Sequence, residues 1–294
     1  MDELLQAPEE APRGLATREI RDVTLRIENP QRAHVLNTLR RPSLKIAAVE
    51  GYQLLAGVSS VWQLNQVSGD RFMRYTDRGR LRGAYGPRTH GQLIAAFQKL
   101  REDPATRQAY VTLWDGMEHN EYSHDVPCTT GFQFFLRDAY LHLRVTMRSN
   151  DAWLGFPIDV MQFSLLHRTM AAALGVVPGH YTHTVGSMHL YEPNYVEALK
   201  AVEEGLTQRW GSPLVENGIP APLPAHGYPN PWIARQKWAE AVVTRPTADV
   251  DTIFDTRETW VLDRLPVHPL EYGLCLDCRY VVPLPCNECK DANE

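Results

Sequence analysis

Alternating polar and apolar side chains predict that this chain is built from both strands and helices. The segment REIRDVTLRIENP (residues 18–30) alternates in the manner of a half-buried strand, and Asn29-Pro30 ends it. Four further segments, rich in strand-forming residues, predict strands at residues 109–114, 131–136, 139–148 and 183–191.

Three other segments carry the pattern of helices. Residues 42–57 begin with Pro-Ser and end at Gly57, which are ordinary helix start and stop signals, and residues 92–101 predict a second helix. Residues 160–174 are almost all apolar or small, so we expect a central helix that is buried on every side and ends at Gly175. The sequence therefore predicts an α+β fold, in which a mixed β-sheet packs against helices.

Composition divides the chain into three parts. Residues 1–15 are rich in Glu, Pro and Ala, and we expect them to form a flexible N-terminal arm. Residues 16–270 are expected to form one domain, in which the repeated prolines of residues 211–234 indicate a long surface excursion. Residues 271–294 form a cysteine-rich C-terminal tail.

Charge and hydropathy argue against two classes of partner. The chain has 294 residues, of which 44% are hydrophobic, and a formal net charge of −5. A dedicated nucleic-acid-binding protein usually carries an excess of positive charge, so no nucleic-acid partner is expected. The chain has no run of 18 apolar residues, so no membrane span is expected, and its acidic N-terminus lacks an apolar signal core, so we expect a cytoplasmic location.

Five cysteines are placed unevenly along the chain. Cys128 stands alone, and the other four form two CxxC pairs near the end: Cys275, Cys278, Cys286 and Cys289. In a cytoplasmic protein, such spacing indicates metal binding or catalysis before disulfides. Two CxxC pairs offer the four thiolates of a structural zinc site, although the loop between them is short. A redox pair and free thiols stay open as alternatives.

Cys128 is a candidate nucleophile. A lone cysteine is more often a plain buried residue, but this one follows Pro127 in a loop between two predicted strands. A catalytic thiol must be partly ionised, and a nearby cation such as Arg148 would lower its pKa. Arg148 and Ser149 could together bind a phosphate group, the guanidinium in a bidentate manner and the hydroxyl as a further donor.

Asp159 stands between Pro157-Ile158 and the most hydrophobic predicted helix. One interpretation is that its carboxylate is the N-cap of that helix. The other is that burial beside the apolar helix raises its pKa and keeps it protonated for a functional role. Local sequence leaves both open.

Several of these segments together resemble a known family. The segments are VEGYQLLAG (49–57), GAYG (83–86), TRQAYVTLWD (106–115), Pro127-Cys128, MRSNDAWLGFPID (147–159) and GHYTHTVGSMHLY (179–191). Their order and spacing over residues 16–195 resemble the core of thymidylate synthases and of their pyrimidine-hydroxymethylating relatives. The resemblance implies a thymidylate synthase-like catalytic domain that forms a homodimer through one face of its sheet.

The resemblance also implies a role for each matching residue. Cys128 matches the nucleophile that adds to C6 of the pyrimidine, and Glu50 matches the acid that organises proton transfer. The residues matched to the nucleoside monophosphate are Arg18, Arg107 (from the neighbouring subunit), Arg148 and Ser149 at the phosphate, and His189 and Tyr191 at the sugar 3′-hydroxyl. The residues matched to the one-carbon donor, 5,10-methylenetetrahydrofolate, are Glu50, Tyr85, Asp151 and Gly155.

Asp159 is the most informative departure from the family pattern, because the family has an asparagine there that reads the base. Uracil offers an N3–H donor and an O4 acceptor, which an amide complements, whereas cytosine offers an N3 acceptor and an N4 amino donor. A protonated carboxyl group can donate to N3 and accept from N4. An unpaired buried polar group costs about 1–3 kcal/mol, so Asp159 favours CMP or dCMP over the uracil nucleotides.

A second departure concerns the product. Thymidylate synthases carry a tryptophan before the GxxYG-type segment, which supports hydride transfer, and the comparable RFMRYTDRG (71–79) has none. Its absence favours water addition and a 5-hydroxymethyl product. The alternatives are a C5-methyltransferase on dCMP or dUMP and, from another class, a non-catalytic nucleotide- or RNA-binding module.

Overall fold

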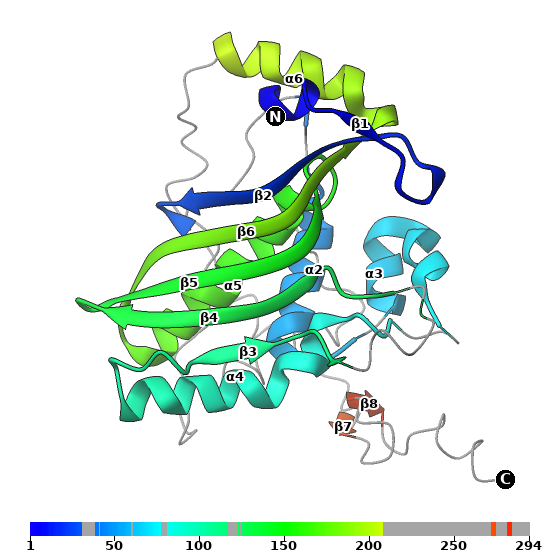
Figure 1. Cartoon of the computed structure of the whole chain (residues 1–294). Helices are drawn as coiled ribbons and strands as arrows, with labels where there is room; N and C mark the ends of the chain where they lie inside the picture. Colours follow the sequence, from blue (N-terminus) through cyan, green and yellow to red (C-terminus); the bar gives the residue numbers. More distant parts are fainter. Residues whose placement is uncertain are drawn as a thin grey trace, which may run out of the picture.

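The computed structural model describes residues 1–207, apart from 31–38, 41, 60, 78–80, 117–122 and 124, together with residues 272–274 and 281–283. Its centre is a mixed β-sheet whose strands lie in the order β1-β2-β6-β5-β4-β3 (Figure 1). The bounds of these strands are β1 (Glu9–Glu10), β2 (Thr17–Ile27), β3 (Tyr110–Thr112), β4 (Thr129–Arg137), β5 (Tyr140–Asp151) and β6 (Val177–Tyr191). A separate short pair consists of β7 (Tyr272–Leu274) and β8 (Val281–Pro283).

The helices are unequal in length and in burial. The described α-helices are α1 (Asp2–Leu5), α2 (Leu44–Ala56), α3 (Val61–Ser68), α4 (Tyr85–Glu102), α5 (Phe156–Leu174) and α6 (Tyr195–Thr207). Short 3-10 turns occur at η1 (Pro12–Gly14), η3 (Gly69–Tyr75) and η5 (Glu192–Asn194). The expected α+β architecture, a mixed sheet packed against helices, is confirmed.

The central helix α5 connects the two parallel strands of the sheet. Strands β5 and β6 pair in parallel, while the other neighbours pair antiparallel. A parallel pair needs a crossover, and α5 provides it against the sheet. Every residue from Asp159 to Ala171 is buried, as expected for a helix packed on all sides.

One face of the sheet carries the helices, and no helix of the described residues covers the other face, which is turned toward the viewer (Figure 1). Along β5, Leu141, Leu143 and Val145 are buried, whereas the intervening Arg144 is exposed. This alternation separates a core face from an open face. The use of the open face for dimerisation stays a prediction.

Two helices begin earlier than the apolar pattern indicates. Helix α4 begins at Tyr85 rather than at residue 92, and α5 begins at Phe156 rather than at residue 160. A proline lies in the first turn of each, Pro87 and Pro157, where its missing N–H removes no intrahelical bond. Both extra turns carry polar or aromatic residues of the candidate site, which is why the apolar pattern does not include them.

The first 15 residues make more contacts than a flexible arm would. Leu4 and Leu5 of α1 are 3% and 8% exposed and belong to the main hydrophobic core, so the expectation of a loosely attached arm does not describe this segment. The acidic and proline-rich composition of residues 1–15 does not indicate that these two leucines attach the segment to the core.

The predicted excursion at residues 211–234 and the cysteine tail lie outside the described residues, apart from two short strands. No helix in the described part of the chain is both long and apolar enough to span a membrane.

Candidate active site

Cys128 lies directly before β4, and its half-buried thiol faces the guanidinium of Arg148 from β5. Arg148 Nη2 lies 3.7 Å from Cys128 Sγ. The same guanidinium donates to the carbonyl oxygens of Pro127 at 3.0 Å and Val126 at 3.1 Å. Arg148 thus holds the loop that presents the thiol, in addition to placing a positive charge beside it.

Burial outweighs the cations in setting the thiol's acidity. It raises the pKa of Cys128 above its ordinary value; the charge of Arg148 lowers it, and Asp159 and Asp125 raise it further. Arg13 also lowers the pKa of Cys128. The expectation that Arg148 favours the thiolate is correct in direction, but burial dominates.

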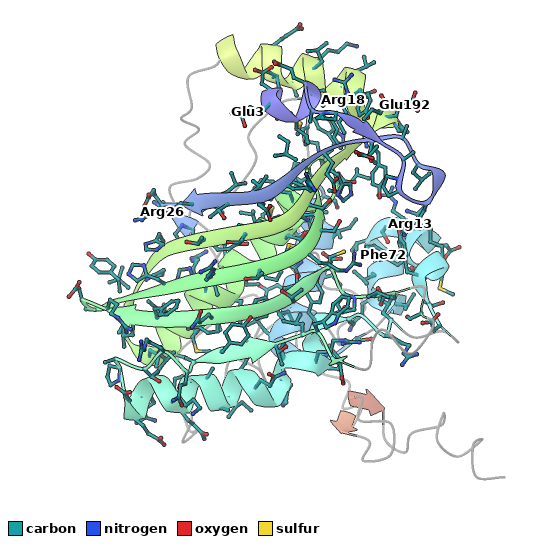
Figure 2. The ribbon with its side chains drawn as sticks, in the orientation of Figure 1. Glu3, Arg13, Arg18, Arg26, Phe72 and Glu192 are labelled. Carbon is teal, nitrogen blue, oxygen red and sulfur yellow. The ribbon has the colours of Figure 1, made fainter. Side chains whose placement is uncertain are left out.

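Arg13 is a cation that sequence reasoning missed. It lies in η1, in the connection between β1 and β2, with a positive φ of 58° beside Gly14 at 76°. Figure 2 shows Arg13 at the outer end of this connection, on the side of Phe72, whereas Arg18 lies at the start of β2 near α6. The Arg18 guanidinium stacks over the ring of Tyr195 at 5.0 Å. Its assignment as a phosphate ligand stays a prediction.

Glu50 and Tyr85 bring an acid and a phenol to the same region. Burial, and after it the charges of Asp159 and Asp125, raise the pKa of Glu50 to about 8. Tyr85 is the first residue of α4, and its ring stacks on Phe163 of α5 at 6.0 Å. Its pKa is raised by burial and by the charges of Asp159, Cys128 and Glu50. These couplings place acid, phenol and thiol within electrostatic range of one another.

Asp159 is buried inside this group rather than capping its helix. The N-cap of α5 is Gly155, and no side chain caps the helix, so the N-cap interpretation of Asp159 is wrong. Its carboxyl oxygens accept from Asn150 Nδ2 at 2.7 Å and Gln162 Nε2 at 2.8 Å. Burial raises the pKa of Asp159 to about 7, although both amide donors oppose the shift. The group is therefore poised between its neutral and ionised forms near neutral pH.

The Asn150 amide connects Asp159 to two residues of β6. His183 Nε2 lies 3.0 Å from Asn150 Oδ1, and His183 Nδ1 contacts the hydroxyl of Tyr181. Asn150 is 4% exposed, and His183 and Tyr181 are fully buried. Neither Asn150 nor His183 was singled out from the sequence, because buried polar residues on strands have no local pattern that distinguishes them from half-exposed ones.

Of the remaining predicted residues, some contact one another beside the site, whereas Asp151 binds the backbone of the turn before α5. Ser149 Oγ lies 3.3 Å from His189 Nδ1, and the His189 and Tyr191 rings meet edge to face at 5.0 Å. Asp151 accepts the backbone N–H groups of Trp153 at 2.8 Å and Leu154 at 2.9 Å, so it shapes the turn that leads into α5.

Gly155 lies beside Asp159, whereas Arg107 lies beside Gln133 of β4. A Cβ added at Gly155 would lie 3.2 Å from Asn150 Nδ2 and 3.5 Å from Asp159 Oδ2, so this glycine leaves room for that contact. Arg107 is exposed, and its carbonyl accepts from Gln133 at 3.0 Å. Gln133 lies five residues beyond Cys128 along β4, or roughly 16 Å at the usual strand rise. A role for Arg107 in a neighbouring subunit stays a prediction.

No cluster of three or more His, Cys, Asp or Glu side chains suited to a metal ion occurs among the described residues. Cys275, Cys278, Cys286 and Cys289 lie outside those residues. The zinc hypothesis for the tail thus rests on spacing alone.

Comparisons with known proteins agree with this geometry. Residues 6–211 match the family model described as Thymidylate synthase. A deoxyuridylate hydroxymethyltransferase from Bacillus phage SP01 is 31% identical over 207 residues, which cover 63% of this chain and 53% of that protein. A thymidylate synthase from Mycoplasma genitalium is 31% identical over 129 residues, which cover 43% of this chain and 44% of that protein. The chain thus spans about half the length of these two relatives.

A solved structure shares the fold. The thermostable thymidylate synthase A from Bacillus subtilis superposes with a TM-score of 0.57 at 24% identity, over 64% of this chain and 72% of that one. At this identity the likeness concerns the fold alone.

Proposed function

Because the chain belongs to the thymidylate synthase family, we propose that it is a folate-dependent pyrimidine nucleotide 5-hydroxymethylase that acts on CMP or dCMP. The co-substrate, 5,10-methylenetetrahydrofolate, supplies a one-carbon unit at the oxidation level of formaldehyde. The observation that carries the proposal is the buried carboxyl group of Asp159, whose pKa of about 7 leaves it largely neutral in a mildly acidic solution and about half neutral at pH 7.

Cys128 begins the reaction by adding to C6 of the pyrimidine. The new C6–S bond makes C5 nucleophilic, so that C5 can accept the one-carbon unit. Arg148 favours the thiolate by its charge and holds the loop that aims it. Once C5 has bonded to the one-carbon unit, the C5 proton leaves and the C–N bond to tetrahydrofolate breaks, which expels tetrahydrofolate and leaves an exocyclic methylene. Water then adds to this methylene, and elimination of the Cys128 thiol restores the ring and the enzyme.

Glu50 is suited to the proton transfers of this sequence. A carboxyl group with a pKa of about 8 is protonated at neutral pH and can return its proton after giving it up. Burial is the main cause of that pKa, and neighbouring carboxyl groups add to it.

Asp159 selects the base. A neutral carboxyl group donates to N3 of cytosine and accepts from its N4 amino group. Uracil presents the reverse pair, an N3–H donor and an O4 acceptor, so a carboxyl group held in the cytosine-reading orientation would face donor with donor and acceptor with acceptor. The phage relative is named for deoxyuridylate, so base choice is the point at which this chain is proposed to differ from that relative.

Two observations favour a hydroxymethyl product over a methyl product. The phage relative is named a hydroxymethyltransferase, and the segment RFMRYTDRG lacks the tryptophan expected for hydride transfer. The second candidate is a C5-methyltransferase, which the thymidylate synthase from Mycoplasma genitalium favours by its name.

One assay separates these candidates. CMP, dCMP, UMP and dUMP are each incubated with the protein and 5,10-methylenetetrahydrofolate, and the nucleotide and folate products are identified. The proposal predicts a 5-hydroxymethylcytosine nucleotide and tetrahydrofolate, whereas a 5-methyl product with dihydrofolate would support the methyltransferase. Cys128→Ser is the control and should lose at least a thousandfold in turnover. A non-catalytic binding module would release no tritium from C5 of any of the four nucleotides.

A further inference from the structure

A line of buried hydrogen bonds ends at the carboxyl group of Asp159. Asn150 donates to one carboxyl oxygen and Gln162 to the other, at 2.7 and 2.8 Å. Both amide side chains are 4% exposed, so they make these bonds away from bulk water. An asparagine at position 159 would direct its own NH₂ group at one of these two donors. The surroundings of Asp159 therefore require an acceptor on both sides, which a carboxyl group provides and an amide does not.

The far end of the Asn150 amide is held by His183. Burial lowers the pKa of His183 to about 4, so its imidazole is neutral and has one N–H. With that proton on Nε2, His183 donates to Asn150 Oδ1, and its Nδ1 accepts from the hydroxyl of Tyr181. Phe156 packs edge to face against the His183 ring at 5.2 Å and fixes its position. Every donor in the line then points toward Asp159.

We infer that Asn150 is the positioning residue for the base-reading carboxyl group of Asp159, and that His183 orients the Asn150 amide. The inference rests on the proposed function, because that function assigns Asp159 to the base. A reversed amide would present its oxygen to Asp159, and the proton of the neutral carboxyl group would bind Asn150 rather than N3 of cytosine. The direction of the line therefore leaves that proton available to the nucleotide.

The titration of Asp159 depends on a defined set of neighbours. Other groups coupled to it, from four elements and a loop, are Glu50 (α2), Tyr85 (α4), Asp151 (β5), Tyr181 (β6) and Cys128. Of these, Asp151 raises the pKa of Asp159, whereas the bonds from Asn150 and Gln162 lower it. Removing the Asn150 donor alone should consequently move the Asp159 titration upward.

Infrared difference spectroscopy of the carboxyl band measures this titration without turnover, with Asp159→Asn as the blank. In Asn150→Leu, which has a similar volume, the midpoint should rise by about one pH unit, because the carboxylate loses a charge-assisted bond. His183→Leu should shift it in the same direction, since the amide is no longer oriented. His183→Gln is the matched control: its amide nitrogen can replace Nε2, and the wild-type midpoint should be kept. If Asn150→Leu does not fold, the comparison of His183→Leu with His183→Gln provides the test.

Kinetics provide a second readout. In Asn150→Leu, kcat/KM for the cytosine nucleotide should fall about tenfold, and its alkaline limb should move to higher pH, while His183→Gln retains both. An unchanged midpoint in Asn150→Leu and His183→Leu would overturn the inference, as would equal effects of His183→Gln and His183→Leu. A wild-type protein that converts no pyrimidine nucleotide would refute the proposed function, whereas the titration would still decide how Asp159 is positioned.

Discussion

Burial and neighbouring charges act in opposite directions on the pKa of the Cys128 thiol. Burial and the carboxyl groups of Asp159 and Asp125 raise its pKa, while Arg148 and Arg13 lower it. The two arginines come from different parts of the chain, Arg148 from β5 and Arg13 from the connection between β1 and β2, and only Arg148 contacts the sulfur among the described hydrogen bonds. The thiolate therefore depends on a segment that lies more than 100 residues away in sequence.

The contribution of Arg13 can be measured by alkylation. In Arg13→Ala, the pH midpoint for reaction of Cys128 with iodoacetamide should rise, since a cation that favours the thiolate is lost. Arg18→Ala is the matched control, because Arg18 lies over Tyr195 and is not among the charges that act on Cys128. A shift in Arg18→Ala but not in Arg13→Ala would contradict this account of the two arginines.

At the scale of elements, helices α4 and α5 bring the site together by their first turns. Tyr85 begins α4, and Asp159 lies in the first turn of α5. Gly86 allows the start of α4 to approach α2, because an added Cβ would lie 2.4 Å from the carbonyl oxygen of Gln53 and 2.5 Å from that of Val58. This approach fixes Tyr85 beside the helix that carries Glu50.

A pair of glycines in α4 tests this approach. Gly86→Ala should destabilise the fold by about 2 kcal/mol or more, because backbone must move. Gly91→Ala, in the same helix, has no atom within 4 Å of the added Cβ and should stabilise it by about 0.5–1 kcal/mol. Urea unfolding of both variants gives these values. Equal stability of the two variants would show that α4 does not depend on close contact with α2.

The sequence predicted the elements whose apolar period is regular and missed details that depend on tertiary contacts. Helix α2 was expected over residues 42–57 and spans Leu44–Ala56, with Ser43 accepting from the backbone of Ile46. The first turns of α4 and α5 were missed because their residues face the site rather than the core. Likewise, Asn150 and His183 meet only when β5 and β6 pair, so no local pattern could join them.

At the scale of the whole molecule, burying carboxyl groups makes stability depend on pH. The pKa of Asp159 is raised from 3.8 to about 7 and that of Glu50 from 4.5 to about 8. Since both folded-state values lie above the unfolded ones, the folded protein holds more protons between roughly pH 4 and 8. The stabilisation linked to these groups is present at low pH and is lost as the pH rises through this window.

Comparison with Asp159→Asn isolates the contribution of this carboxyl group. Wild type should lose up to about 4 kcal/mol of unfolding free energy from Asp159 between pH 4 and 8, whereas the variant should lack this component. Histidines such as His183, whose pKa is lowered, have the opposite dependence and are common to both proteins. Urea unfolding at pH 4 and pH 8 provides the measurement. A wild-type dependence identical to that of Asp159→Asn would show that Asp159 is ionised in the folded state.

The proposed homodimer can be tested by mixing two variants that are each inactive alone. If Arg107 serves the phosphate site of the neighbouring subunit, mixing inactive Arg107→Ala with inactive Cys128→Ser should restore activity, because one site of the mixed dimer has both residues intact. The expected recovery is about a quarter of wild-type activity at equal mixing, if subunits exchange at random. Lys99→Ala mixed with Cys128→Ser is the activity control and should keep about half of wild-type activity whether or not subunits exchange, so exchange is followed separately with differently labelled subunits. No recovery, despite demonstrated exchange, would place Arg107 outside the partner's site.

Base choice by Asp159 is the central claim, and one ratio tests it most directly. The measurement is kcat/KM for the cytosine nucleotide divided by that for the uracil nucleotide, in wild type and in Asp159→Asn. The account predicts a fall in this ratio of about 100-fold, since two hydrogen bonds to the base are reversed. Any general disturbance of the buried amides affects both substrates and cancels in the ratio. An Asp159→Asn protein that prefers cytosine as strongly as wild type would contradict the account.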